Sequence, residues 1–199
     1  GCHLFIEKPL SVDTDRIDEL MDLVHRKKLT AMVAYQYRFH PGLIQVAQWL
    51  KNKIIGQPVS ATLVQGDYLP QWHPYEDYRD SYASRKELGG GVLLTQIHEF
   101  VNALHLFGLP RRIFALGGKL SQLEINVEDT ASVLMECAHK GKILPVTILT
   151  DFLQSPPVRN CTIIGESGRI FLNLIDNNLS LTIINISTLI FKSNNKKEG

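Results

Sequence analysis

The stretch that decides the fold lies near the start of the chain and reads Phe5-Ile6-Glu7-Lys8-Pro9-Leu10-Ser11. The apolar run His3–Ile6 predicts a short strand, and the lysine stands where that strand ends. A helix can begin soon afterwards, with Ser11 or Asp13 as its N-cap. The stretch therefore predicts a strand end that carries a cation and leads into a helix.

The next residues complete a β-α-β unit. Apolar residues at i, i+3, i+4 and i+7 predict one face of a helix, and they are Ile17, Leu20, Met21 and Val24. A second buried strand is predicted for Thr30–Tyr37, and such a unit has a right-handed crossover and parallel strands. No Gly-rich phosphate-binding turn precedes it. We therefore expect the chain to be the later part of a longer protein, truncated at its N-terminus.

The composition is that of a folded protein without a nucleic-acid footprint. The 199 residues are 44% hydrophobic, and the formal net charge is +1 with no basic stripe. Cys2, Cys137 and Cys161 are too scattered for a disulfide framework, so we expect reduced thiols and a cytoplasmic location. The apolar run Leu179–Phe191 is interrupted by polar residues and is too short to cross a membrane. A compact small-molecule substrate is expected, with no nucleic-acid or membrane partner.

The remainder of the chain predicts helices followed by a sheet. One helix should begin at Pro41 and end before Gly56, and another should follow Gly89–Gly91 and end at Gly108. The apolar face of the second helix is predicted to comprise Leu94, Ile97, Val101 and Leu104. The segment Asp67–Tyr82 has weak periodicity and predicts a long ordered loop. Strands are predicted at Val59–Gln65, Ala131–Cys137, Ile143–Phe152, Asn160–Ile164, Arg169–Leu174 and Leu179–Ile186.

These elements predict an α/β (α+β) fold. Residues 1–38 would be the C-terminal remnant of a dinucleotide-binding domain, the end of a Rossmann-type parallel sheet. Residues 39–191 would be an α/β domain with a large, mainly antiparallel open sheet that binds substrate and associates with other subunits. Residues 192–199 are expected to be a disordered tail.

Two residues are candidates for chemistry. Lys8 lies at the rim of an open sheet, where its ammonium could polarise an oxygen on a reacting carbon; a solvated lysine beside a proline turn is the alternative. His98 shares a helix face with Thr95 and Asn102, which could orient an imidazole for proton transfer. A packed structural histidine is the alternative there. The preceding glycines would allow close approach by a ligand.

Other residues suit substrate contacts or structural roles. A polyol site is indicated by flat apolar faces mixed with hydrogen-bond donors, which are supplied by Tyr68, Trp72, His73, Tyr78 and Arg79. A loop held by aromatic packing is the alternative. Arg38 and His40 could reach the same rim as Lys8, or each could equally be a surface residue at a strand-to-helix turn. Glu128-Asp129 is expected to form an ion pair or a cap, with catalysis as the alternative. No Cys/His cluster appears, so we expect no metal.

The ordered motifs are similar to those of the Gfo/Idh/MocA family of nicotinamide-dependent oxidoreductases, which includes glucose–fructose oxidoreductase and inositol 2-dehydrogenase. The resemblance runs from Glu7 to about Leu172, and it is carried by the segments Glu7–Pro9, Tyr35–Pro41, Gly89–His98 and Val127–Thr130. It implies hydride transfer between NAD or NADP and a hydroxyl carbon of a sugar, a sugar derivative or a cyclitol. It also implies a homo-oligomer that forms through the open sheet.

The resemblance implies roles for particular residues. Lys8 and His98 would be catalytic, with Lys8 near the nicotinamide and His98 in proton transfer. Cofactor contacts would come from Glu7, Lys8, Pro9 and Arg38, and Thr95 would join the substrate site. The family usually has an aspartate shortly before this histidine, whereas Leu94 and Thr95 stand here, so electrostatic support for a nearby cation is weaker. A non-catalytic ligand-binding or assembly module with the same C-terminal fold is the alternative.

Overall fold

The computed structural model describes residues 1–139, 141–184 and 189–192, which belong to two compact units that divide between Gln36 and Tyr37. The predicted boundary after Arg38 lies two residues further along the chain. Of the expected tail, Lys192 ends a strand, while residues 193–199 lie outside the described residues. The end of the predicted strand Leu179–Ile186 lies outside them too.

The first unit is a β-α-β unit, as predicted. It comprises β1 (Leu4–Ile6), α1 (Ile17–Arg26) and β2 (Ala31–Val33), and the two strands pair in parallel. Some details differ from the prediction. The second strand is not buried, since Ala31 and Met32 are exposed and Val33 is half-buried. Met21, on the predicted apolar face of the helix, is exposed as well. Helix α1 begins after Arg16, without a side-chain cap, so neither Ser11 nor Asp13 caps it. Strand β2 ends at Val33, because the chain turns into a 3-10 helix over Gln36–Phe39.

The helices of the second unit are α2 (Pro41–Lys51), α3 (Val92–Thr95) and α4 (His98–Phe107). Pro41 opens α2 as predicted, and the ring of His40 accepts a hydrogen bond from the Gly42 N–H. The single helix predicted after Gly91 is wrong, since the backbone breaks at Gln96 between α3 and α4. Short 3-10 turns occupy the predicted loop and its continuation, at Leu69–Gln71, Tyr78–Asp80, Tyr82–Ser84 and Lys86–Leu88.

Eight strands form one sheet in the described part of the second unit. They are β3 (Pro58–Gly66), β4 (Pro110–Gly118), β5 (Thr130–His139), β6 (Lys142–Asp151), β7 (Val158–Gly165), β8 (Gly168–Asn173), β9 (Asn178–Ile183) and β10 (Leu189–Lys192). Their order is β10-β9-β8-β7-β3-β6-β5-β4. Only β3 and β6 pair in parallel among these strands, so the sheet is mainly antiparallel, as predicted.

Two strands were not predicted, and both lie at edges. The residues between Pro110 and Gly118 are half-buried or exposed throughout β4, so no alternation of apolar and polar residues marks this strand. It pairs with β5 on one side only. Strand β10 lies at the opposite edge, near the end of the chain.

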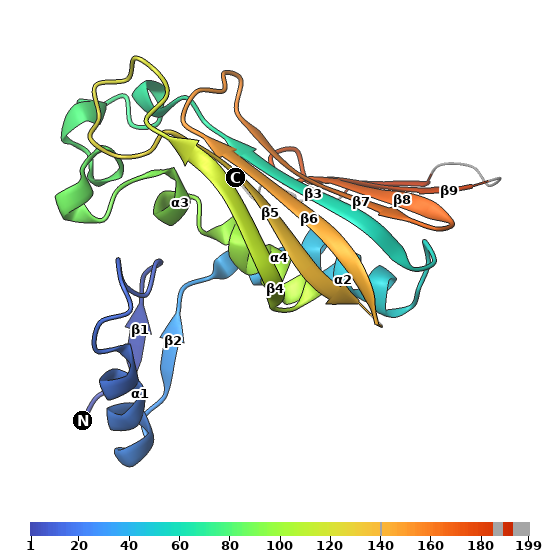
Figure 1. The fold of residues 1–199 in the computed structure, drawn as a ribbon, viewed down its shortest axis with the longest axis horizontal. Coiled ribbons are helices and arrows are strands. Elements are labelled where there is room, and N and C mark those ends of the chain that lie inside the picture. The colour runs from blue at the N-terminus through green and yellow to red at the C-terminus, as the bar shows by residue number, and fades with distance from the viewer. Residues whose placement is uncertain (140, 185–188, 193–199) are drawn as a thin grey trace, which may run out of the picture. The chain divides into compact units, whose positions relative to one another are not determined.

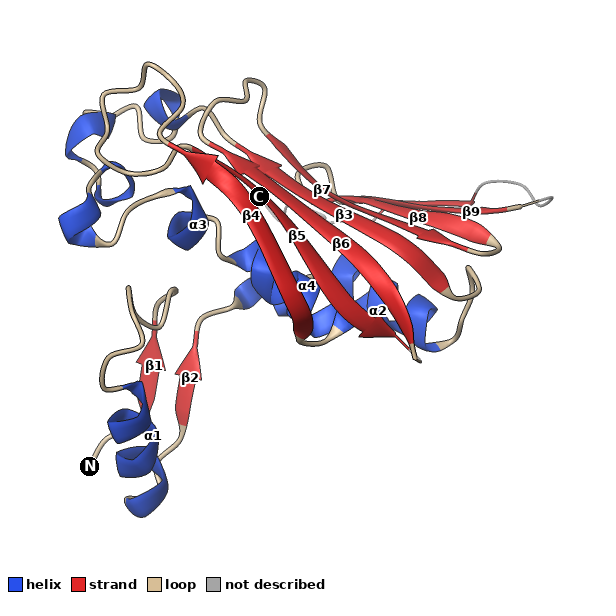
Figure 2. Ribbon diagram, viewed as in Figure 1, coloured by secondary structure: helices blue, strands red, loops and turns tan. Residues whose placement is uncertain are grey.

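Helices α2 and α4 cover one face of the sheet, and the short helical turns gather at one end of it (Figures 1 and 2). The core lies between those helices and the sheet. Its fully buried side chains include Leu43 of α2, Leu63 of β3, Ile148 of β6 and Ile163 of β7. Helix α4 packs on this core through β3, β5 and β6.

Candidate functional site

In the first unit, the predicted cation stands at the carboxyl end of β1. Lys8 follows Ile6 by two residues and is half-buried, whereas Glu7 is exposed. The peptide bond between Lys8 and Pro9 is cis. Ligands of open α/β sheets bind at the carboxyl ends of the strands. The position of Lys8 suits such a contact, and its role stays a prediction.

In the second unit, other atoms of the protein occupy the space next to the glycines that precede α3. A Cβ at Gly90 would overlap backbone carbonyls of Tyr82 and Ala83, and one at Gly91, whose φ is +102°, would overlap the Glu128 carboxylate. The Glu128 carboxylate accepts a hydrogen bond from the Leu93 N–H at 3.1 Å. These glycines therefore allow the protein's own backbone and Glu128 to approach, which differs from the expected approach by a ligand.

The buried side of α3 and α4 carries a stripe of polar residues beside the apolar Val92, Ala103 and Phe107. Thr95, His98, Glu99 and Asn102 are all buried, in the order i, i+3, i+4, i+7. The predicted apolar face is wrong: Leu94, Ile97 and Val101 are half-buried, and Leu104 is exposed. Asn102 shares the face of His98 in α4, as expected, whereas Thr95 lies across the break, in α3, and is buried like them. A polar stripe on the buried side of a helix is the feature from which we build the site.

An aromatic ring and an ion pair adjoin this stripe. The ring of Tyr37 lies 4.9 Å from that of His98, between centroids, at 57°. The guanidinium carbon of Arg159, from β7, lies 3.5 Å from the centroid of the same tyrosine ring. Arg159 also donates through Nε to Oε1 of Glu99 at 2.7 Å, and both side chains are buried. The second unit thus brings together His98, Thr95, Asn102, Tyr37 and this ion pair.

Sequence reasoning missed Tyr37, Glu99 and Arg159 as site residues. Two signals could have found them. Glu99 falls on the same helical stripe as His98, and Arg159 stands in the alternation that buries Cys161 and Ile163. A charged residue in a buried alternation is unusual and requires a partner. The identity of that partner, 60 residues away, was not readable from either pattern.

The predicted polyol residues lie in a second cluster on the loop after β3. Tyr68, Trp72 and Tyr78 pack around a small core that contains Leu69 and Phe152. The ring of Trp72 lies 6.0 Å from that of Phe152, edge to face. His73 stacks on Tyr75 and contacts the Glu76 carboxylate at 2.5 Å. Aromatic packing therefore accounts for much of this loop, and the substrate contacts stay predictions.

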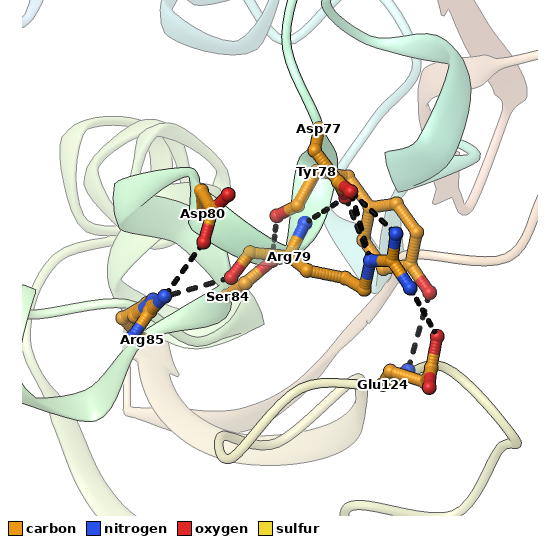
Figure 3. Close-up of polar contacts among 7 residues, drawn as sticks. All are labelled: Asp77, Tyr78, Arg79, Asp80, Ser84, Arg85 and Glu124. Carbon is orange, nitrogen blue, oxygen red and sulfur yellow. Dashed lines mark hydrogen bonds and ion pairs between the residues drawn. The ribbon is translucent and has the colours of Figure 1, made fainter.

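Arg79 is held by two carboxylates. It pairs with Asp77 on its own turn and with Glu124, 3.0 Å away, on the loop before β5 (Figure 3). These hydrogen bonds lower the pKa of Asp77 to about 2. The Glu124 N–H also donates to the Tyr78 hydroxyl. The contacts join the two loops, and a substrate contact by Arg79 stays a prediction.

The remaining candidates have structural contacts. Arg38 is exposed, and its Nη2 lies 3.5 Å from Nδ1 of His105. Burial and, to a smaller extent, this guanidinium lower the pKa of His105. Nε2 of His40 lies 2.7 Å from the Asn177 side-chain oxygen. A cofactor contact by Arg38 stays a prediction.

Asp129, next to the capping residue Glu128, is a buried hydrogen-bond acceptor. Its carboxylate accepts from the N–H groups of Leu120 and Ser121 at 2.9 Å, and from the Ser121 hydroxyl at 2.6 Å. Glu128, which accepts from an N–H in the first turn of α3, agrees with the predicted cap, whereas Asp129 accepts its hydrogen bonds from a loop and not from a helix end. Among the residues that the structure describes, no group of three or more His, Cys, Asp or Glu side chains could hold a metal ion, and no helix is long and apolar enough to span a membrane.

These features define a class of protein: an α/β domain in which helices cover one face of a large mainly antiparallel sheet, attached to a β-α-β unit. Residues 43–171 match the model of the GFO/IDH/MocA C-terminal domain, and the chain belongs to this family. The predicted family and fold class are confirmed.

Relatives and solved structures agree with this assignment. The chain is 31% identical over 116 residues to D-xylose 1-dehydrogenase (NADP(+)) 2 of Haloferax volcanii, and the matched region covers 58% of this chain and 34% of that protein. It is 26% identical over 174 residues to myo-inositol 2-dehydrogenase of Thermotoga maritima, covering 85% and 48%. An NAD binding oxidoreductase from Klebsiella pneumoniae has the same fold, with a TM-score of 0.80 at 19% identity, covering 96% and 54%. The chain therefore spans about half the length, or less, of these proteins.

Proposed function

We propose that this chain is the substrate-binding and catalytic portion of an oxidoreductase that transfers a hydride between NAD or NADP and a hydroxyl carbon of a sugar, a sugar derivative or a cyclitol. The observation that carries the proposal is the buried polar stripe of α3 and α4 with His98 on it. The named activities of the D-xylose and myo-inositol dehydrogenases support the reaction class.

The residues of the first unit fit one end of the cofactor better than the other. Lys8 lies at a strand end, where a nicotinamide ring and a substrate oxygen can be contacted. The N-terminus of α1 carries Asp18 and Glu19 in its first turn, and Arg16 pairs with Glu19. Carboxylates at a helix N-terminus repel a pyrophosphate instead of binding it. Within residues 1–36, we therefore assign only nicotinamide-side contacts.

The proposed chemistry requires a proton to move as the hydride moves. The nicotinamide supplies the hydride acceptor, and the chain supplies the groups that act on the oxygen. His98 would take the hydroxyl proton of the substrate. Lys8, in the first unit, is assigned a separate contact on the nicotinamide side. Thr95 cannot carry a charge at the position of the usual aspartate. The buried carboxylate on the stripe is Glu99, on the C-terminal side of the histidine.

The test measures ligand binding and turnover in the same 199-residue chain. Binding of NADH and NADPH is followed by nicotinamide fluorescence, and myo-inositol and D-xylose are titrated by calorimetry. Reduction of NAD(P)⁺ is then followed with each polyol. We expect His98→Gln and Lys8→Met to lower turnover by about 10²-fold or more, with the exposed His25→Gln as the matched control.

The outcomes separate the proposal from its alternative. Binding of polyol and of nicotinamide without any reduction would favour the second candidate, a non-catalytic binding module, for which Leu94 and Thr95 in place of the usual aspartate are the motivating observation. Turnover that survives both substitutions would exclude the assigned residues. A chain that binds neither polyol would contradict both candidates.

We also propose that a second copy of the chain covers the open face of the sheet. One row of paired residues across this face carries no charge, and it runs Phe114, Leu134, Thr147, Thr62, Thr162, Phe171. Phe114 is 67% exposed and Leu134 is 46% exposed. Uncharged rows of this kind suit packing against another sheet. Sedimentation velocity at micromolar concentration tests the proposal, and a monomer would contradict it.

A further inference from the structure

An ion pair is buried beside the candidate proton carrier. Glu99 is 0% exposed and follows His98 directly in α4. Its Oε1 lies 2.7 Å from Nε and 2.6 Å from Nη2 of Arg159, which is 9% exposed. The pair therefore joins helix α4 to strand β7 within the covered face of the sheet.

Such a pair is a poor device for stability. Removing two charges from water costs free energy that their attraction only partly recovers, and apolar replacements of the same volume are often as stable. Burial raises the pKa of Glu99, and the attraction of Arg159 opposes that shift. The Asp67 carboxylate acts in the same direction as burial. The pair is present although burial disfavours it, so its effect on neighbouring side chains is the better explanation for its presence.

The pair holds the ring of Tyr37. Because Glu99 fixes the guanidinium by two contacts to one oxygen, the planar group of Arg159 lies against the tyrosine ring, 3.5 Å from its centroid. On another side, the ring of His40 is stacked at 15° and 6.3 Å. The Asn177 side chain and the Gly42 N–H hold His40 in turn. Tyr37 is thus fixed by neighbours from three parts of the second unit.

The Tyr37 ring also contacts the ring of His98. Their centroids are 4.9 Å apart and the rings are tilted by 57°, a favourable geometry for an aromatic pair. The contacts therefore form a continuous path from Glu99 through Arg159 and Tyr37 to the imidazole. Each step is a direct contact between named side chains.

We propose that Glu99 and Arg159 form a clamp that orients the imidazole of His98 through the ring of Tyr37. The inference rests on the proposed function for the use of His98, because orientation matters most where a proton is transferred. Glu99, Arg159 and Tyr37 are positioning residues in this proposal. A proton carrier displaced by about 1 Å loses about 10²-fold in rate, so a clamp on the imidazole has a catalytic use.

The test reads the orientation of His98 without requiring turnover. The Hε1 and Hδ2 resonances of His98 are assigned in the 199-residue chain by their absence from His98→Gln. The tyrosine ring displaces these resonances by its ring current, and Tyr37→Leu should remove the displacement. The double variant Glu99→Gln with Arg159→Met avoids an unpaired buried charge, so it should fold, and it should shift the same resonances in the same direction as Tyr37→Leu.

Two further variants separate a clamp from a general effect of charge. Arg159→Lys keeps the charge near Glu99 but loses the planar face of the guanidinium. The His98 resonances of this variant should therefore differ from those of the wild type. Arg169→Met removes another arginine placed over an aromatic ring, 5.4 Å from the centroid of Phe171, and should leave His98 unchanged. Wild-type His98 resonances in Arg159→Lys, or unchanged His98 resonances in the double variant, would overturn the clamp.

The clamp and the proposed function can fail separately. If the resonances move in the double variant but turnover of the chain is unaffected, the clamp stands and His98 is not the proton carrier. If His98→Gln abolishes turnover while the resonances of the double variant do not move, the proton carrier stands and the clamp is wrong. When both hold, the double variant should lose about 10- to 10²-fold in kcat with less change in KM.

Discussion

The two faces of the sheet in the second unit depart from ordinary side-chain distribution in opposite ways. The helix-covered face buries a charged residue, Arg159, in the same alternation as Cys161 and Ile163. The open face leaves Phe114 and Leu134 in contact with solvent. Buried charge and exposed large apolar surface are the informative exceptions to the rule that apolar residues lie inside. The buried charge of Arg159 indicates a group held in position for chemistry, and the exposed apolar surface indicates association with another protein chain.

The physical difference lies in what compensates each exception. On the covered face the compensation is internal, because Glu99 neutralises Arg159 within the same unit. On the open face no described residue of the chain covers Phe114, and compensation would come from a second copy, as proposed. Perturbing the covered face should therefore change the stability of the folded unit, whereas perturbing the open face should change association.

The largest effect is expected from breaking the buried pair on the covered face. Glu99→Ala leaves the Arg159 guanidinium buried without its partner and should cost about 3–5 kcal/mol of the free energy of unfolding. Urea denaturation measures this loss. The double variant Glu99→Gln with Arg159→Met is the matched control, and it should lie much closer to the wild type. Equal losses in the two variants would mean that packing, and not the unpaired charge, sets the cost.

An intermediate effect is expected at the end of the sheet, where Asp129 accepts its hydrogen bonds. Burial opposes ionisation there, but the hydrogen bonds from Ser121 and Leu120 outweigh it and lower the pKa of Asp129. In the unfolded state the pKa of an aspartate is about 3.9, so a lower pKa in the folded state stabilises the fold at pH values above about 3.9. This stabilisation is lost as the pH falls through the pKa of the folded state. Asp129→Asn should therefore cost about 1–3 kcal/mol at neutral pH.

The pH dependence of stability is the control for the Asp129→Asn prediction. The difference in unfolding free energy between the wild type and Asp129→Asn should shrink as the pH falls below about 4. Denaturant titrations at several pH values measure it. A difference that is independent of pH would show that the carboxylate charge contributes nothing.

The smallest effect on stability is expected on the open face. Leu134→Lys places a charge on a residue that is already 46% exposed, so the unfolding free energy of the monomer should change by no more than about 0.5 kcal/mol. The same substitution should abolish the proposed dimer, which sedimentation equilibrium measures. Leu104→Lys, on the exposed side of α4, is the matched control. A dimer that survives Leu134→Lys would contradict association through this face.

Much of the fold could be predicted because local patterns and packing agree. The helix opened by Pro41 buries Leu43 and Val46, and strands β6 and β7 bury alternate residues, as their periodicity indicates. The prediction failed where the packing environment overrides the pattern. Helix α4 buries Glu99 and Asn102 and exposes Leu104, because the surroundings of that face supply polar partners such as Arg159. Strand β4 was missed because an edge strand with exposed side chains has no alternation to detect.

The sequence by itself determined the β-α-β unit, the mainly antiparallel sheet, the family and the candidacy of Lys8 and His98, since each depends on residues close together in the chain. Only the tertiary structure decided what surrounds His98. Tyr37, Glu99 and Arg159 come from a turn, a helix and a strand, and no local pattern links them. Burial makes each charge depend on a specific partner, and the pairing of β7 with β3 and the packing of α4 bring those partners together.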